Sequence, residues 1–242
     1  MAQSVLTCVS GFWPIKNKHG TKFMNWFKTS LRVNCPYVFF TTRQGIEFIK
    51  PFRKGLPTHY IECRIEDFYT YRYKANMTVH PQHCPSQELN LIWHEKLFLV
   101  ERAAQLNPFK SDFFCWVDAG VCIYRENPPS TRPFPNLPKL QQLPKDKFIF
   151  SSSSSQPFLD HLTTPKSYYH YIAGTAYILH ANIISHFVEL YKAYLAKIFS
   201  ETELYKYNLW TDQVLLTHIF KTYPHKFYKI GEGYGQVMQT LA

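Results

Sequence analysis

The feature that most constrains the fold of this chain is the alternation of short, continuous apolar runs with longer amphipathic stretches. The apolar runs cover residues 4–9, 37–40, 113–117, 148–150 and 176–179. Such runs are typical of strands that are buried on both faces, as in parallel sheets. Helical periodicity covers residues 21–33, 86–107, about 182–199 and about 211–223. This order predicts an α/β fold with a mostly parallel sheet flanked by helices.

Three segments do not follow this pattern clearly. Residues 58–79 include an aromatic and basic stretch and are not assigned to an element. Residues 127–144 contain six prolines and are interpreted as a loop or extended lid, too short to separate two domains. The glycine cluster at residues 231–235 is interpreted as a loop, because no helix clearly follows it.

The charge of the chain favours an anionic partner. Lys and Arg number 27 against 17 Asp and Glu, which gives a formal charge of +10. Nucleic acid, a membrane surface and a phosphorylated small molecule all fit this charge, and composition does not choose among them. The six cysteines form no C-x-x-C pair, so a zinc ribbon is disfavoured and reduced, structural thiols are expected.

Neither a signal peptide nor a membrane span is indicated. The first apolar run has no basic segment before it, which is typical of a strand and not of a signal peptide. The longest uncharged run, residues 167–188, is interrupted by Ser, Asn and His. We expect a cytoplasmic protein, with peripheral contact at a membrane left open.

A carboxylate directly follows the most apolar predicted strand. Asp118, Ala119 and Gly120 come immediately after residues 113–117. In open α/β sheets, ligands bind beside the carboxyl ends of the strands, and a glycine allows a ligand to approach the backbone closely. An aspartate there can hold a divalent cation that bridges a diphosphate, or it can simply cap the next turn.

Two later segments are further candidates. Thr211 is a plausible N-cap, and Asp212 is either a favourable first-turn anion or a general base for an acceptor hydroxyl. Ala173, Gly174 and Thr175 either expose backbone amides to a ligand or make a tight bend. The H-E pair at residues 94–95 lacks the second histidine of a zinc-protease motif, and neither phosphate-binding glycine loop is present.

Together these segments resemble a known family. The motifs are W-H-E-K at 93–96, N-P-F at 107–109 and F-C-W-V-D-A-G at 114–120. They look like the HtrL/YibB (WlaTC-type) family, which is associated with surface-polysaccharide and lipopolysaccharide gene clusters. The later order, I-A-G-T-A-Y-I-L at 172–179 followed by W-T-D-Q-V-L at 210–215, is similar to GT-A glycosyltransferases. The resemblance covers roughly residues 4–230.

The resemblance implies a fold and an activity. The fold would be one GT-A-like, Rossmann-related domain over residues 1–242, with a mixed, mostly parallel sheet. Its donor-binding part would be about 1–125, the proline-rich loop about 126–145 and the acceptor side about 146–242. The activity would be transfer of a hexose or pentose from a nucleotide-diphosphate sugar, with a UDP-sugar favoured, to a glycan or glycolipid hydroxyl.

The resemblance also implies roles for individual residues. Asp118 would bind Mn²⁺ or Mg²⁺ and the donor diphosphate, although Gly120 replaces the second Asp of the D-x-D motif. Asp212 would be the catalytic base or would position the sugar, and Thr175 and Trp210 would bind the acceptor. The residues implied in donor binding are Ser10, Gly11, Phe12, Thr41, Lys96, Asp118, Ala119, Gly120 and Gly174. Lys96 would pair with Asp118 or with phosphate.

Two alternatives remain at the level of sequence. The basic and aromatic residues 69–74 are typical of a surface that stacks on single-stranded nucleic acid, although no recognised binding motif accompanies them. A GT-A-shaped protein without catalytic activity is the other alternative, for which Gly120 is the motivating residue.

Overall fold

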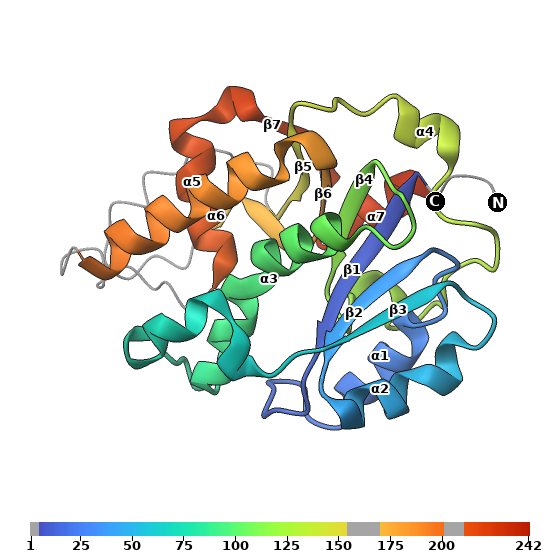
Figure 1. Cartoon of the computed structure of the whole chain (residues 1–242), viewed down its shortest axis with the longest axis horizontal. Coiled ribbons are helices and arrows are strands. Elements are labelled where there is room, and N and C mark those ends of the chain that lie inside the picture. The colour runs from blue at the N-terminus through green and yellow to red at the C-terminus, as the bar shows by residue number, and fades with distance from the viewer. Residues whose placement is uncertain (1–4, 154–169, 201–210) are drawn as a thin grey trace.

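The computed structural model describes residues 5–153, 170–200 and 211–242. Within these residues, strands form one seven-stranded sheet in the order β3-β2-β1-β4-β6-β5-β7 (Figure 1). The strands are β1 (Leu6–Phe12), β2 (Tyr37–Thr41), β3 (Thr58–Glu62), β4 (Phe113–Val117), β5 (Phe148–Ser152), β6 (Ile172–His180) and β7 (Phe227–Glu232). Strand β6 is antiparallel to both neighbours, and the other ladders are parallel. The expected α/β fold with a mixed, mostly parallel sheet is confirmed.

Helices cover both faces of the sheet (Figure 1). The α-helices are α1 (Lys22–Ser30), α2 (Arg43–Ile49), α3 (Gln87–Leu106), α4 (Leu137–Gln141), α5 (Ala181–Ser200), α6 (Asp212–Thr222) and α7 (Gln236–Leu241). The shorter 3₁₀ helices include η3 (Tyr69–Asn76) and η4 (Cys122–Tyr124). One buried cluster joins α3, α5 and α6 to the sheet, and a second joins α1 and α7 to its other face.

The alternation of side chains along β4 explains why this run is apolar throughout. Phe114 and Trp116 belong to the cluster under α3, whereas Phe113 and Cys115 belong to the cluster on the opposite face. A strand with helices on both faces has no side that faces water, so every position favours an apolar residue.

The strand order creates a position where ligands commonly bind. From β1 the chain continues to β2 on one side, whereas β4 pairs with β1 on its other side. A crevice outside the carboxyl ends of the strands is expected where the order reverses in this way. Because β6 is antiparallel to β4, the start of β6 lies at the same edge as the end of β4.

Several expectations about local structure were wrong. Gly174 lies inside the continuous strand β6 and does not make a bend. The turn at residues 233–235 leads into helix α7, with Gly235 as its N-cap at φ 76°. The proline-rich segment, expected to be a loop, contains the short helix α4. Residues 58–79, for which no element was predicted, contain the edge strand β3 and helix η3.

The cysteines are all free thiols, and five of the six are buried. The sulfur atoms of Cys8 and Cys35 lie 3.5 Å apart. Among the helices in the described residues, none combines the length and apolar character needed to cross a bilayer.

Candidate active site

A cavity of about 590 Å³ lies at the sheet edge where β1 and β4 end. Its walls include Gly11 and Phe12 from β1, Asp118 after β4, and Thr175 from β6. The N-terminus of α6 contributes Asp212. This volume is within the range of small-molecule sites, and the position is the crevice that the strand order predicts.

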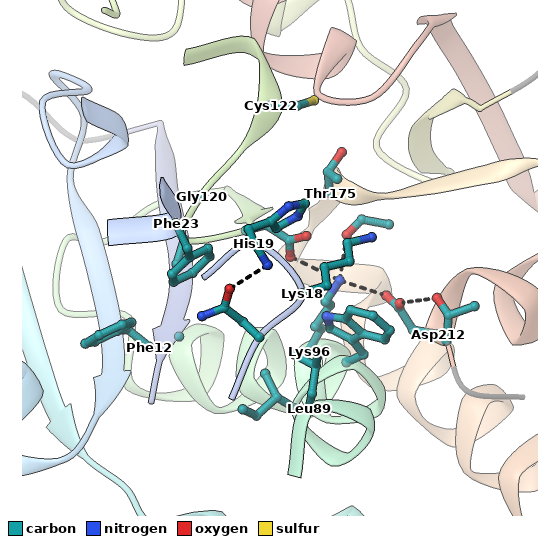
Figure 2. A pocket seen from close by; sticks show the side chains of 18 of the residues that line it. Phe12, Lys18, His19, Phe23, Leu89, Lys96, Gly120, Cys122, Thr175 and Asp212 are labelled. Carbon is teal, nitrogen blue, oxygen red and sulfur yellow. Dashed lines mark hydrogen bonds and ion pairs between the residues drawn. The ribbon is translucent and has the colours of Figure 1, made fainter. Parts of the chain in front are cut away.

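The floor of the cavity is a buried cluster of one ammonium group and two carboxylates (Figure 2). Lys96, from α3, is only 3% exposed. Its Nζ lies 3.0 Å from Asp118 Oδ1 and 3.2 Å from Asp212 Oδ2. The same group donates a hydrogen bond to the Gly174 carbonyl oxygen at 3.0 Å. One lysine thus joins helix α3, the end of β4, strand β6 and the start of α6.

Lys96 reaches this position because α3 packs across β1 and β4. The Ser86 hydroxyl caps the helix by accepting from the Leu89 amide at 3.2 Å. The Lys96 ammonium also lies 5.9 Å from the centre of the Trp116 ring. The face of an aromatic ring stabilises a nearby cation, so Trp116 on β4 stabilises the Lys96 ammonium group.

Asp118 is held in one orientation by its neighbours. Its backbone amide donates to the Thr175 carbonyl oxygen at 2.9 Å, which extends the pairing of β4 with β6. Its Oδ1 accepts from the Trp116 indole Nε1 at 2.7 Å as well as from Lys96. The side chain remains 27% exposed, so Asp118 is the carboxylate that faces the open cavity.

Asp212 is the more deeply buried carboxylate, with its side chain 4% exposed. It is the first residue of α6, where a negative charge is favourable, and the Thr211 hydroxyl donates to its Oδ1 at 3.2 Å. Next to it, Gln213 Oε1 accepts from the Gly174 amide at 2.8 Å. A Cβ on Gly174 would lie 2.7 Å from Asp212 Oδ2, so α6 can approach β6 this closely only at a glycine.

Burial and the Lys96 charge act in opposite directions on the pKa values of the two carboxylates. Burial raises the pKa of Asp118 and of Asp212 above the ordinary value, and the nearby ammonium opposes that shift without cancelling it. Burial alone would lower the pKa of Lys96, but the two carboxylates outweigh it and raise that pKa. Two acids share one cation, so the floor carries excess negative charge when both are ionised.

Gly120 is closed off by an aromatic ring. A Cβ at this position would lie 2.9 Å from Phe23 Cε2 on α1, so a side chain there would require the Phe23 ring to move. Both acids of the floor already pair with Lys96, whose charge would repel a divalent cation at Asp118. In the described residues, no three His, Cys, Asp or Glu side chains are grouped to hold a metal. Asp118 and Asp212 thus fit the ammonium group of Lys96 better than they fit Mn²⁺ or Mg²⁺. Binding of a metal ion at Asp118 stays a prediction.

The structure brings most of the predicted site residues together. Those that line the cavity are Gly11, Phe12, Lys96, Asp118, Ala119, Gly120, Gly174, Thr175 and Asp212. Ser10 and Thr41 do not line it, because the Ser10 hydroxyl donates to the Val117 carbonyl oxygen at 2.7 Å and the Thr41 hydroxyl to that of Phe12. Trp210 lies outside the described residues.

Two aromatic residues that border the cavity, Phe12 and Trp13, pack mainly into the core. Phe12 is 6% exposed, and its ring lies 4.6 Å from that of Phe27. Trp13 packs edge-on against Phe68, and its Nε1 donates to the Cys63 carbonyl oxygen at 2.9 Å. Both rings therefore border the cavity with little free surface.

The aromatic and basic residues 69–74 do not form an open stacking surface. The Tyr69 ring stacks on Phe98 at 4.5 Å, and the Arg72 guanidinium lies 3.9 Å from the Tyr69 ring centre. The buried Glu95 carboxylate accepts from the backbone amides of Tyr69 and Thr70, which holds η3 against α3. Base stacking on Tyr69 would require these contacts to break.

Sequence reasoning missed three basic residues of the cavity. Lys18 and His19 come from the loop between β1 and α1, and Arg125 follows η4. Each is a basic residue in an irregular segment, where no periodic pattern separates a ligand-binding side chain from a solvated one. The sequence could have indicated these residues only by their position, because each follows a strand that ends at the sheet edge where ligands are expected to bind.

Comparisons with known proteins give a family and distant structural neighbours. The sequence model of HtrL_YibB, described as "Bacterial protein of unknown function", matches residues 58–238. One similar structure is a glycosyltransferase involved in glycosylation of the major capsid of PBCV-1, with TM-score 0.43, 13% identity, and coverage of 95% of this chain and 82% of that one. Another is 4-diphosphocytidyl-2C-methyl-D-erythritol synthase from Anaerococcus prevotii, with TM-score 0.42, 10% identity, and coverage of 96% and 90%. No curated protein matches the chain.

Proposed function

We propose a function for this chain, which belongs to the HtrL_YibB family of bacterial proteins. The proposed function is that of a GT-A-like glycosyltransferase that uses a nucleotide-diphosphate sugar. The observation that carries the proposal is the buried cluster of Asp118, Lys96 and Asp212 at the floor of the cavity. Buried carboxylates with raised pKa values in a cleft are typical of acid–base chemistry. The cavity also lies where α/β sheets bind nucleotides.

The sequence resemblance supports the choice of substrate. We propose a UDP-sugar as donor and a hydroxyl of a surface glycan or glycolipid as acceptor. The sugar lies above the floor, where the exposed part of Asp118 accepts hydrogen bonds from sugar hydroxyls. Thr175, across the cavity on β6, contacts the acceptor.

The proposed reaction breaks the bond between the anomeric carbon and the diphosphate oxygen. The electron pair of that bond leaves with the diphosphate, and the acceptor oxygen forms the new bond to the sugar. In an inverting reaction, Asp212 takes the proton of the acceptor hydroxyl, and the pKa that burial raises makes its carboxylate a stronger base than an exposed one. In a retaining reaction, Asp212 positions the sugar instead. Lys96 fixes the distance between the two carboxylates in both cases.

A thermal-shift panel tests the proposal. UDP-, GDP- and CMP-sugars are added to the purified chain, with and without Mn²⁺, and the unfolding temperature is measured. We expect one diphosphate donor class, UDP-sugars first, to raise that temperature, because a ligand that binds the folded state stabilises it. If no nucleotide sugar changes it under either condition, the proposal is wrong.

Turnover separates an enzyme from a protein that only binds the donor. Release of free nucleotide from the best donor is followed for the wild type, Asp118→Ala and Asp212→Ala. Both variants should lose turnover and keep the fold, whereas Asp146→Ala, on an exposed side chain, should match the wild type. Donor binding without turnover in the wild type, with glycan acceptors present, would support the non-catalytic alternative.

A further inference from the structure

Three basic side chains line the cavity close to its acidic floor. Lys18 and His19 reach it from the loop after β1, and Arg125 reaches it from the segment after η4. Figure 2 places Lys18 and His19 within the cavity, near Phe23 and above Lys96. The three residues come from two segments that each follow a strand of the switch point.

Arg125 is held in place without an acidic partner. Its guanidinium lies 4.1 Å from the centre of the Trp26 ring, which also contacts the His19 ring at 4.9 Å. The Arg125 Nε is buried and makes no hydrogen bond. Within the described chain, no carboxylate forms an ion pair with Lys18 or Arg125. A buried, unpaired donor is costly unless a ligand satisfies it.

These basic groups also repel one another. Burial, followed by the charges of Arg125 and Lys18, lowers the pKa of His19 to about 4. Burial and then the charge of Arg125 lower the pKa of Lys18. Like charges that converge on a cavity create a positive potential, which attracts an anion, and the charge of Asp118 opposes it only in part at Lys18.

At the floor of the cavity, both carboxylates are already paired and are not free to bind a metal ion. Asp118 and Asp212 share the ammonium of Lys96, and Phe23 fills the space beside Gly120. The floor is acidic and pairs internally through Lys96. Lys18 and Arg125 make no ion pair within the described residues, and the charge of Asp118 acts on Lys18 without an ion pair.

We propose that Lys18 and Arg125 bind the donor diphosphate directly and supply the positive charge that a divalent cation would otherwise supply. This inference rests on the proposed function. When the anomeric bond breaks, the leaving diphosphate oxygen keeps the electron pair. The guanidinium N–H groups of Arg125 and the Lys18 ammonium stabilise that charge with charge-assisted hydrogen bonds. His19 lies beside them and contributes a further N–H donor.

Inorganic pyrophosphate is the probe that tests this inference. Its binding is measured by titration calorimetry, with protein stripped by EDTA, and then again with Mn²⁺ added. We expect binding in EDTA, and about a tenfold to hundredfold weaker Kd in Arg125→Ala and in Lys18→Ala. Lys16→Ala is the matched control, because Lys16 is exposed on the same loop, as Lys18 is, but does not line the cavity.

The outcomes separate this inference from the proposed function. If a nucleotide sugar binds only when Mn²⁺ is present, or if Arg125→Ala binds pyrophosphate as the wild type does, the inference is overturned and the glycosyltransferase proposal stands. If no nucleotide sugar binds with or without Mn²⁺, the proposed function itself fails. Arg125→Lys keeps the charge without the planar fork, and it should bind pyrophosphate with an intermediate Kd.

Discussion

Asp118 and Asp212 lie on different elements and share one ammonium group, since Lys96 Nζ is 3.0 Å from the first carboxylate and 3.2 Å from the second. The first follows β4, and the second begins α6. Their distance from each other is therefore set by a residue of a third element. The position of Lys96 on α3 is as important to the site as the acids themselves.

Replacing either carboxylate by its amide should abolish turnover without loss of stability. Because the pKa of both acids is raised, their ionised forms are disfavoured in the folded chain, and Asn imitates the neutral form. We expect Asp212→Asn to lower turnover by about 10²–10⁴-fold. Its free energy of unfolding should equal or exceed that of the wild type by urea denaturation. Asp146→Asn serves as the surface control, and a large loss of stability in Asp212→Asn would contradict this account.

Removing the cation should have the opposite effect on stability. Lys96→Met leaves two buried carboxylates close together with no counter-charge. We expect the free energy of unfolding to fall by about 3–5 kcal/mol at pH 7. Adding Asp118→Asn to this variant should recover part of the loss, because one of the facing charges is then gone. Urea denaturation of the single and double variants measures both effects, and strictly additive changes would argue against the shared ammonium.

Gly120 and Phe23 should behave as a coupled pair. In Gly120→Ala the new Cβ would approach Phe23 Cε2 to 2.9 Å, and the ring is part of the packing around Phe12. We expect the variant to lose about 1–3 kcal/mol of stability. The loss should be smaller when Phe23→Leu is already present, which a double-mutant cycle on the free energy of unfolding measures. Equal costs in both backgrounds would mean that the ring is not what excludes a side chain.

Glu95 should make the stability of the chain depend on pH. Burial raises its pKa from 4.5 to about 7, despite the hydrogen bonds that Thr70 donates to the carboxylate. Between these values the folded chain keeps a proton that the unfolded chain releases, so the free energy of unfolding falls as pH rises from about 4.5 to about 7. The wild type should lose about 3 kcal/mol more than Glu95→Gln over that range.

Urea denaturation at several pH values provides the measurement for Glu95. Glu189→Gln is the control, since that side chain is 69% exposed. Its pH profile should follow that of the wild type. Parallel profiles for the wild type and Glu95→Gln would show that the buried carboxyl does not titrate in this range.

His19 should report the arrival of an anion. Its pKa is about 4 in the free chain, because burial, Arg125 and Lys18 all disfavour the protonated ring. Bound pyrophosphate adds negative charge beside the ring and should raise that pKa toward the ordinary value of 6.5. NMR titration of the His19 ring proton, assigned with His19→Gln, measures the change. An unchanged pKa at saturating pyrophosphate would place the anion elsewhere.

Strands with neighbours on both sides could be predicted from sequence, and strands at the edges could not. Strands β1, β2, β4 and β5 lie inside the sheet under helices, so they appear as continuous apolar runs. Strands β3 and β7 form the two edges and are only partly buried. Their mixed composition carries no signal that separates them from loops.

The candidate site could be predicted only in part, for a related reason. Asp118, Gly174 and Asp212 follow or begin regular elements, so their positions at one edge follow from the alternation of strands and helices. Lys96 contacts both acids because of the way α3 packs across the sheet. No local sequence pattern predicts that packing. Lys18 and Arg125 lie in irregular segments, so only the folded chain places them together.

The contact between Phe23 and Gly120 limits which side chains this edge of the site can accept. A carboxylate introduced at position 120 would have to displace the Phe23 ring. It would also lie beside an aspartate that is already paired with Lys96. A metal site at this edge therefore depends on three elements at once, namely helix α1, helix α3 and the segment after β4.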